Sequence, residues 1–264
     1  MTNLDTNPVK YQKLTSSQNN LIKSLKKLAL KKYRIASGQF AVENLTIIYD
    51  ALVSGHHFDT LFVTREFILK HPNKIEYLQA HSKCKNYYLI DEKINKHYSQ
   101  LDTPSGITAV YKIKNRELTD TSVIYLDRVS DPGNLGTIMR SALAFGFLNI
   151  VLNKSCADIY NYKTINAVRD AIFKLNILVD KDDAWLDNNT LPIYITSAHT
   201  GQALSKFKPD PVFCLVLGNE SHGTSRKITD KAVIALKIEM SQQIESLNVA
   251  SAAGILFYEL RKMI

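Results

Sequence analysis

Two side chains that could hold a polar group of a ligand follow one short apolar run. Residues 123–126 (VIYL) are apolar, and the turn-forming segment DPGNLG occupies residues 131–136. The amide of Asn134 lies in this segment, and the guanidinium of Arg140 follows six residues later. A helix that begins here would point free backbone N–H groups, which attract anions, at the same place. The spacing therefore indicates a strand-to-helix turn that holds an amide and an arginine near an anionic ligand.

Two further segments place polar residues where a strand is expected to end. In LVLGNESHGTS (215–225) an apolar strand runs into Gly218 and Glu220, and in 238–260 a polar loop leads into an apolar helix. Ligands of open parallel sheets bind outside the carboxyl ends of the strands, so ligand chemistry is expected at these segments. Each segment alone has a structural alternative. Gly218 could serve only a turn, and Ser246 could only cap the last helix, with Asn248 in its first turn.

A purely structural role explains Arg140 less well than the other candidate residues. On a helical wheel one apolar face is formed by Leu135, Ile138, Ala142 and Phe145, and Arg140 lies well away from it. The arginine is therefore expected to face a ligand or solvent instead of the core.

Several common chemistries are excluded by what the sequence lacks. No two of the ten glycines are separated by a single residue, so the dinucleotide fingerprint G-x-G-x-x-G is absent, as is the phosphate-binding G-x-x-x-x-G-K-[ST]. The three cysteines are far apart and the seven histidines are scattered, so no disulfide framework and no metal site are expected. No apolar run approaches a membrane span and the first residues lack a signal-peptide core, which indicates a cytoplasmic protein.

The net charge of +8 is concentrated near the N-terminus. Between Thr6 and Val42 there is no acidic residue, and eight basic residues in that window equal the whole excess. A cluster of one sign suits phosphate backbones, although a solvated helix face is the alternative. The RNA-binding candidates are Lys23, Lys26, Lys27, Lys31, Lys32 and Arg34.

Hydrophobic periodicity predicts two α/β domains joined by a polar linker. The N-terminal domain (1–113) is expected to begin with a helix from Ser16 or Ser17 to about Tyr33, and the linker covers 114–121. In the C-terminal domain (122–264) strands alternate with helices, which is typical of a parallel sheet covered on both faces. Expected strands are 39–43, 60–64, 86–90, 106–113, 122–127, 148–152, 192–198, 212–218 and 234–240, and the main helices are 45–55, 135–146, 163–174, 181–188, 224–231 and 247–263.

The three polar segments together resemble motifs 1, 2 and 3 of the SpoU (TrmH-like) branch of the SPOUT RNA methyltransferases. They are GNLGTIMRSALAFG (133–146), LVLGNESHG (215–223) and SLNVASAAGILFYE (246–259), in the family's order and near its spacing. The similarity covers roughly residues 120–262, and 1–113 more loosely resembles the family's substrate-binding domain.

The resemblance implies a homodimeric enzyme with a deep trefoil knot, which methylates a ribose 2′-hydroxyl of RNA. The methyl donor, S-adenosylmethionine, would be held mainly by backbone groups of the knot loops, without a glycine-rich loop or a metal. Positions similar to the family's cofactor residues are Thr196, Gly218, Ile238, Met240 and Leu247. Positions similar to its catalytic residues are Asn134, Arg140, Glu220, Ser246 and Asn248.

The donor is an activated sulfonium, so the protein must orient the hydroxyl and assist the loss of its proton. Family proposals make the arginine a base, but a guanidinium holds its proton too tightly for that role. We therefore expect Arg140 to clamp the hydroxyl and its phosphate while the proton passes to a phosphate oxygen or water.

Four positions depart from the family's pattern. Glu239 replaces a proline and Gln242 a glycine, and Asn166 and Asp170 replace an arginine and a glycine of R-x-S-x-G-A. An aspartate in place of a glycine could crowd or repel ligand phosphates. Three interpretations follow: an active methyltransferase with ribosomal RNA preferred over transfer RNA, an RNA-binding relative with little or no turnover, or an unrelated small-molecule enzyme.

Overall fold

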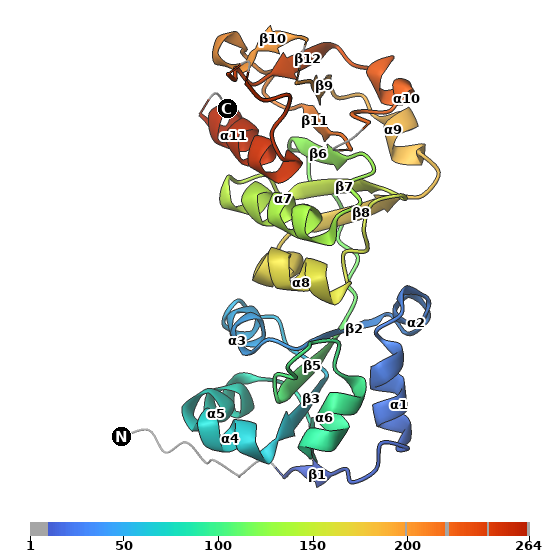
Figure 1. The fold of residues 1–264 in the computed structure, drawn as a ribbon, viewed down its shortest axis with the longest axis vertical. Helices are drawn as coiled ribbons and strands as arrows, with labels where there is room; N and C mark the ends of the chain where they lie inside the picture. The colour runs from blue at the N-terminus through green and yellow to red at the C-terminus, as the bar shows by residue number, and fades with distance from the viewer. Residues whose placement is uncertain (1–9, 199, 220–221, 242, 263–264) are drawn as a thin grey trace. The chain divides into compact units, whose positions relative to one another are not determined.

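The computed structural model describes residues 10–198, 200–219, 222–241 and 243–262. The chain divides into two compact units (Figure 1). The first comprises residues 1–114 together with Tyr160–Tyr162, and the second comprises 115–159 and 163–264. This division falls in the segment predicted to be a linker, while the exact domain limits stay predictions.

The first unit is built on a mixed sheet in the order β1-β4-β3-β5-β2. β3 and β4 run parallel, and β5 runs antiparallel to both of its neighbours, β3 and β2. Aromatic and β-branched residues fill these strands, and alternate side chains enter the two apolar layers beside the sheet. The strands are β1 (Gln12–Lys13), β2 (Gln39–Val42), β3 (Thr60–Thr64), β4 (Asn86–Ile90) and β5 (Ile107–Lys112).

Helices cover both faces of this sheet, with α1 and α6 on one and α3, α4 and α5 on the other (Figure 1). Asn44, Thr64 and Asp91 cap α3, α4 and α6 by accepting N–H bonds, as short polar side chains do at helix starts. The helices are α1 (Asn20–Lys27), α2 (Lys31–Ser37), α3 (Leu45–Val53), α4 (Arg65–Lys70), α5 (Pro72–His81) and α6 (Glu92–Tyr98).

The single basic helix expected from Ser16 or Ser17 to Tyr33 is wrong. Asn19 caps α1, and the chain leaves the helix at Leu28 before α2 begins at Lys31. Arg34 fixes this break, because its Nη1 donates to the Leu28 carbonyl at 2.6 Å. From the sequence, Leu21, Leu25 and Leu28 are expected on the buried stripe of this helix; Leu25 and Leu28 are buried, but Ile22 takes the place of Leu21, which is 42% exposed.

The second unit contains a parallel sheet in the order β10-β12-β9-β11-β6-β7-β8. The α/β class with a parallel sheet is thereby confirmed. Two of these strands, β8 and β10, were not expected from the sequence. The strands are β6 (Val123–Leu126), β7 (Asn149–Asn153), β8 (Asn176–Asp180), β9 (Ile193–Thr196), β10 (Gln202–Ala203), β11 (Cys214–Leu217) and β12 (Ile234–Lys237).

The strand order reverses between β6 and β11. From β6 the chain builds outward through β7 to β8, and β9, β11 and β12 lie on the other side of β6. Such a reversal leaves a crevice at the carboxyl ends of the two central strands, which is where open sheets bind ligands.

Helices flank both faces of this sheet, and α7 and α11 lie side by side on one of them (Figure 1). Ala253 and Phe257 of α11 are fully buried in this packing. Gly136 lets α7 approach α8, since a Cβ there would lie 2.5 Å from the Cβ of Ala167. The helices are α7 (Pro132–Ala144), α8 (Tyr162–Val168), the 3₁₀ turn η1 (Arg169–Phe173), α9 (Ala184–Asn188), the 3₁₀ turn η2 (Leu204–Lys206), α10 (Arg226–Thr229) and α11 (Val249–Arg261).

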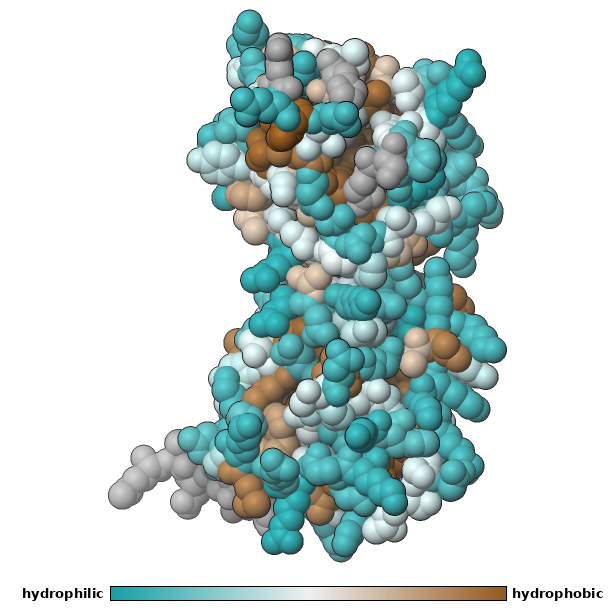
Figure 2. All heavy atoms as spheres, viewed as in Figure 1, coloured by the Kyte–Doolittle hydropathy of each residue, from teal (hydrophilic) through white to brown (hydrophobic). Residues whose placement is uncertain are grey.

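Hydrophilic side chains cover most of the face shown in Figure 2, and apolar atoms appear between them as separate patches. Among the described residues no helix is both long and apolar enough to cross a membrane. The trefoil knot depends on how the chain threads through its own loops, which strand order does not decide, so it stays a prediction.

Candidate active site

The three motif segments emerge from the same edge of the second sheet. The DPGN segment follows β6, the GNESHG segment follows the adjacent β11, and the polar loop before α11 follows β12. Register aligns these ends, because Leu126 pairs with Leu217 and Thr196 pairs with Leu236. Parallel strands thus bring segments separated by about a hundred residues to one place.

Two helix N-termini meet at this edge through the predicted catalytic amides. Asp131 caps α7 by accepting the N–H of Asn134 at 2.7 Å, and Asn248 caps α11 by accepting the N–H groups of Ala250 and Ser251. Nδ2 of Asn248 then donates to Oδ1 of Asn134 at 3.0 Å. Free N–H groups at two adjoining helix starts create a positive potential that favours an anion.

The structure corrects the role suggested for Ser246 as a helix cap. Asn248 is the cap residue, and helix α11 begins one residue later at Val249. Ser246 lies exposed in the preceding loop and forms no hydrogen bond within the described part of the chain. Its hydroxyl is therefore accessible to a ligand.

Arg140 is exposed on α7, on the side away from the buried face, as the helical wheel predicts. Six helical residues separate it from Asn134, which corresponds to about 9 Å along the axis. Within the described residues it has no hydrogen bond or ion pair, so a single chain does not join Arg140 to the Asn134–Asn248 pair. Glu220, the remaining predicted catalytic residue, lies outside the described residues.

The residues predicted to hold the cofactor line the same edge. Thr196 ends β9, and its hydroxyl donates to the Val216 carbonyl of β11 at 3.4 Å. Gly218 is buried directly after β11, where a Cβ would lie 2.5 Å from the Gly223 carbonyl carbon. Only glycine therefore fits at position 218, where the backbone passes Gly223. The half-buried side chains of Ile238, Met240 and Leu247 follow β12.

These features fit S-adenosylmethionine. Exposed loop backbone groups can bind the polar edges of an adenine, and half-buried apolar side chains can cover its ring and the thioether carbons. The tight Gly218 turn keeps the loop backbone close to the sheet edge without any side chain of its own in the way.

Sequence reasoning missed the residues that fasten this loop. Asp127, 1% exposed at the end of β6, accepts the N–H of Ser225 at 2.7 Å. Arg128 contacts the same carboxylate at 3.3 Å and also donates to the Gly223 carbonyl at 3.1 Å. Asn219 returns a bond to the Arg128 carbonyl at 2.9 Å. We call Asp127 and Arg128 the loop clamp.

The backbone of Arg128 shows how closely the clamp is held. Its φ of 60° lies in the left-handed region, which costs a non-glycine residue roughly 1 kcal/mol or more. Neighbouring contacts must hold it there. The signal available in the sequence was an Asp-Arg pair directly after an apolar strand, but its partners lie nearly a hundred residues away.

The thiols of the three cysteines are protonated at neutral pH. Burial raises the pKa of Cys156, next to β6, to about 11, and it raises the pKa of Cys214 in β11 further. Cys84 in the first unit is only half-buried, and burial raises its pKa to about 11 as well. A thiolate is the reactive form, so these side chains are packing groups.

Two of the residues that depart from the family's pattern form contacts with neighbouring side chains. The carboxylate of Asp170 forms an ion pair with Lys174 at 2.5 Å, which offsets the charge expected to repel phosphates. Glu239 accepts a hydrogen bond from the exposed Ser205 hydroxyl at 2.5 Å. Asn166 is half-buried on α8, and Gln242 lies outside the described residues.

The predicted RNA-binding residues of the first unit separate into two groups. Lys23, Lys26, Lys27, Lys31 and Lys32 are all exposed on α1 and α2. Arg34 is only 4% exposed and bonds the Leu28 carbonyl, so its assignment to RNA is wrong. A charge count along the sequence cannot distinguish a buried structural arginine from a free one.

Family comparisons agree with this geometry. The model of the SpoU rRNA Methylase family matches residues 121–258, and that of the MRM3-like substrate binding domain matches residues 19–109. The chain therefore belongs to the SpoU rRNA methylase family.

Individual relatives match nearly the whole chain. The 23S rRNA (guanosine(2553)-2'-O)-methyltransferase RlmP of Bacillus subtilis (strain 168) is 30% identical over 95% of this chain and 99% of its own length. A putative RNA methyltransferase of the TrmH family from Porphyromonas gingivalis is similar in structure, with a TM-score of 0.79, 28% identity and coverage of 93% of this chain and 98% of its own. An AdoMet-bound rRNA methyltransferase from Sinorhizobium meliloti shares the fold, with a TM-score of 0.80, 24% identity and coverage of 96% and 98%.

The loop clamp yields the first prediction. Asp127→Ala leaves the part-buried N–H of Ser225 without its acceptor, so the free energy of unfolding of the second unit should fall by about 1–3 kcal/mol. Affinity for S-adenosylhomocysteine should fall by about tenfold, since ordering the loop would then use roughly 1.4 kcal/mol of the binding energy. Calorimetric titration and chemical unfolding measure the two effects. Asp120→Ala, at an exposed position before β6, is the matched control and should change neither quantity.

Proposed function

We propose that this chain transfers a methyl group from S-adenosylmethionine to a ribose 2′-hydroxyl of RNA, with ribosomal RNA the preferred substrate. The observation that carries the proposal is the contact between Asn134 and Asn248. It unites the first and third motifs of a SpoU methylase at two helix N-termini. The similarity to RlmP, a 23S rRNA 2′-O-methyltransferase, supports the choice of RNA. Such a substrate places the enzyme in the cytoplasm.

The chain's own groups would orient the substrate. When bound, the cofactor supplies a methyl group on an electron-poor sulfur. The Asn134–Asn248 pair orients the ribose hydroxyl, and the two helix starts attract the neighbouring phosphate. Ser246 and Glu220 supply further polar contacts. The hydroxyl proton passes to a phosphate oxygen or water as the new carbon–oxygen bond forms.

Arg140 acts as a clamp on the ribose hydroxyl and phosphate in this proposal. Its planar guanidinium can donate two parallel hydrogen bonds to phosphate, and its exposure on α7 leaves it available. Within one chain it does not contact the amide pair, so we infer that a second copy of the chain contributes to a complete site.

The proposed homodimer interface involves the outward face of α11. From the sequence, the small residues Ala250, Ala253 and Gly254 and the aromatic Phe257 on this helix predict a dimer. Ala250, Ala253 and Phe257 are buried against the chain's own core, so they require no partner. Gly254 instead lies on an outward stripe at helical spacing with Ser251, Ile255 and Tyr258. Ile255 is 40% and Tyr258 is 51% exposed, and nothing lies within 4 Å of a Cβ built on Gly254.

The second candidate, an RNA-binding relative with little turnover, is favoured by Glu239 and by Asn166 in place of an arginine. Asp170 also departs from the family's pattern, but its charge is balanced by the ion pair with Lys174. It is therefore not an argument for a loss of activity. Turnover measured with saturating cofactor distinguishes the two candidates.

The exposed lysines should grip RNA phosphates without reading sequence. Changing Lys26, Lys27, Lys31 and Lys32 to Gln should weaken binding to many RNAs alike. Each lost phosphate contact should reduce the slope of log affinity against log salt by about 0.7–0.9. As a control of equal charge change, Lys70, Lys83, Lys85 and Lys93 become Gln. An unchanged slope in the first variant would show that these lysines only face solvent.

Arg140→Ala should lower the single-turnover methylation rate by about 10²–10³, because removing one preorganised donor typically costs that factor. Cofactor affinity by calorimetry should barely change, since Gly218, Ile238 and Leu247 are proposed to hold the donor. Arg140→Lys should restore little, because a point charge does not reproduce a planar two-pronged donor. Near-normal turnover of Arg140→Ala, or equal losses of rate and cofactor binding, would refute this role.

The dimer surface is tested by placing a charge on it. Ile255→Asp combined with Tyr258→Asp should give a monomer in light scattering at micromolar concentration, because unpaired carboxylates would be buried at the interface. Val233→Asp, at an apolar side chain 70% exposed elsewhere in the same unit, is the control and should leave the mass unchanged. A wild-type chain that is monomeric throughout this range would contradict the proposal.

A further inference from the structure

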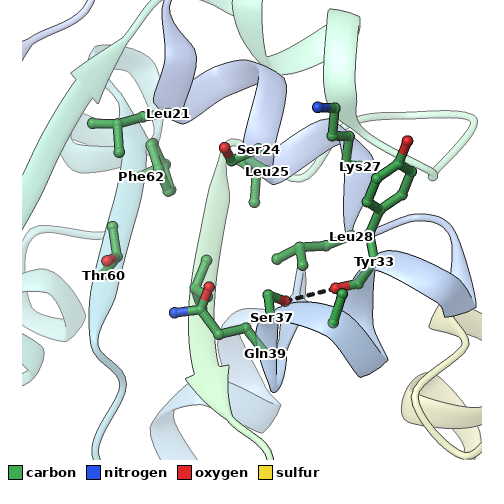
Figure 3. A pocket seen from close by; sticks show the side chains of 12 residues that line it. Leu21, Ser24, Leu25, Lys27, Leu28, Tyr33, Ser37, Gln39, Thr60 and Phe62 are labelled. Atoms are coloured by element: carbon green, nitrogen blue, oxygen red, sulfur yellow. Dashed lines mark hydrogen bonds between the residues drawn. The ribbon is translucent and has the colours of Figure 1, made fainter.

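A groove of about 360 Å³ opens in the first unit between helices α1 and α2 and the sheet (Figure 3). Its wall on the helix side comes from α1, Leu28 and α2, and the opposite wall comes from β2, β3 and β5. The lining residues are Leu21, Ser24, Leu25, Lys27, Leu28, Tyr33, Ala36, Ser37, Gln39, Thr60, Phe62 and Val110.

Strand register explains why this part of the sheet is open. Thr60 pairs with Val110, and Val110 pairs with Ala41, so Thr60, Val110 and Gln39 share one face of the sheet. Helix α1 packs on the part of that face around Phe62, through Ile22 and Leu25. It leaves the part beside the edge strand β2 without a complete cover.

The groove combines an apolar floor with a polar rim. Phe62 and Val110 of the sheet are buried. Ser24, Ser37, Gln39 and Thr60 carry hydroxyl and amide groups around the groove (Figure 3). A flat molecule with polar edges matches such a site, because its faces contact apolar surface and its edges form hydrogen bonds.

The positive charge around the groove favours anionic ligands. None of the twelve lining residues is acidic, and Lys27 is one of them. The ammonium groups of Lys27 and Lys32 lie 5.3 and 5.0 Å from the ring centre of Tyr33, which lines the same groove. A half-buried aromatic ring with two cations beside it resembles the platforms on which proteins stack unpaired bases while holding the adjoining phosphates.

We propose that this groove accepts one unpaired nucleobase of the RNA substrate, with the flanking phosphates on the lysines of α1 and α2. The inference rests on the proposed function and deepens it, since it specifies single-stranded RNA, such as a loop or bulge, as the element that the first unit recognises. Bases in a regular RNA duplex are stacked and paired, so they cannot enter a groove of this kind. Duplex RNA would use only the lysines.

The test fills the groove with a large side chain. Ser24→Trp, at an exposed position of α1, places an indole in the groove without changing the charge. Ser54→Trp, at an exposed position after α3, is the matched control. Three fluorescently labelled RNA probes of equal phosphate number are used: a single-stranded decamer, the same decamer with abasic riboses, and a duplex. Fluorescence anisotropy measures each affinity across a range of salt.

The wild-type chain and Ser54→Trp should bind the single-stranded decamer about tenfold more tightly than the abasic one, which is within the contribution of one stacked base. Ser24→Trp should lose this preference while keeping the wild-type salt slope, because the lysines are intact. Thermal unfolding of all three proteins should coincide within a few degrees. If Ser24→Trp unfolds early, Gln39→Ala, which removes one rim amide, should reduce the same preference.

Other outcomes distinguish a failure of the groove proposal from a failure of the proposed function. Equal wild-type affinity for the decamer and the abasic probe, with a normal salt slope, would overturn the groove and leave RNA binding in place. An unchanged preference for the decamer over the abasic probe in a folded Ser24→Trp would likewise overturn the groove. Failure of the wild-type chain to bind any RNA would count against the proposed function itself.

Discussion

A buried carboxylate at the end of one strand holds the candidate site together. Asp127 is almost inaccessible to solvent, and an isolated charge there would be strongly unfavourable. The N–H of Ser225 and the guanidinium of Arg128 compensate it, and Arg128 extends the connection to the Gly223 carbonyl. The bond from Ser225 to this carboxylate is short at 2.7 Å, as is typical of a charge-assisted bond, so Ser225 is fixed to the end of β6 before any ligand arrives. The rest of the site depends on that connection, because the first motif follows β6, the second follows β11, and the third joins them through the contact between Asn248 and Asn134.

Preorganisation extends from this loop to the amide pair. Asn134 and Asn248 each belong to a capped helix start, and the caps hold their backbones in place independently of the substrate. Orientation that exists before binding does not have to be obtained from binding energy, which lowers the barrier to reaction. The structural role of Asn248 as a cap and its proposed role toward the ribose therefore support one another.

The sequence predicts those features that depend on neighbouring residues. Alternating strand and helix patterns identified the parallel sheet, and strands such as β3 and β4 have the expected limits because apolar runs and turn residues bound them. Strand β8 was missed, since 176–180 (NILVD) is half-exposed at a sheet edge and has no clear alternation. The break between α1 and α2 was missed because the bond from Arg34 to Leu28 decides it. Motif resemblance supplied the site candidates, whereas the Asp127–Ser225 bond joins residues 98 positions apart and leaves no local pattern.

Each of the two units contains at least one cysteine, so the rate at which its thiol is modified can measure local unfolding of that unit. Cys84 is the cysteine of the first unit. Cys156, which follows β7, and Cys214, which lies in β11, belong to the second. Burial keeps all three as protonated thiols in the folded chain, so a thiol-specific reagent must wait for local opening before it can react. The half-buried Cys84 would exchange through small fluctuations, while the fully buried Cys214 requires the central strands to separate. The rates of modification of the native cysteines can therefore be used to compare the stability of the two units without introducing a label.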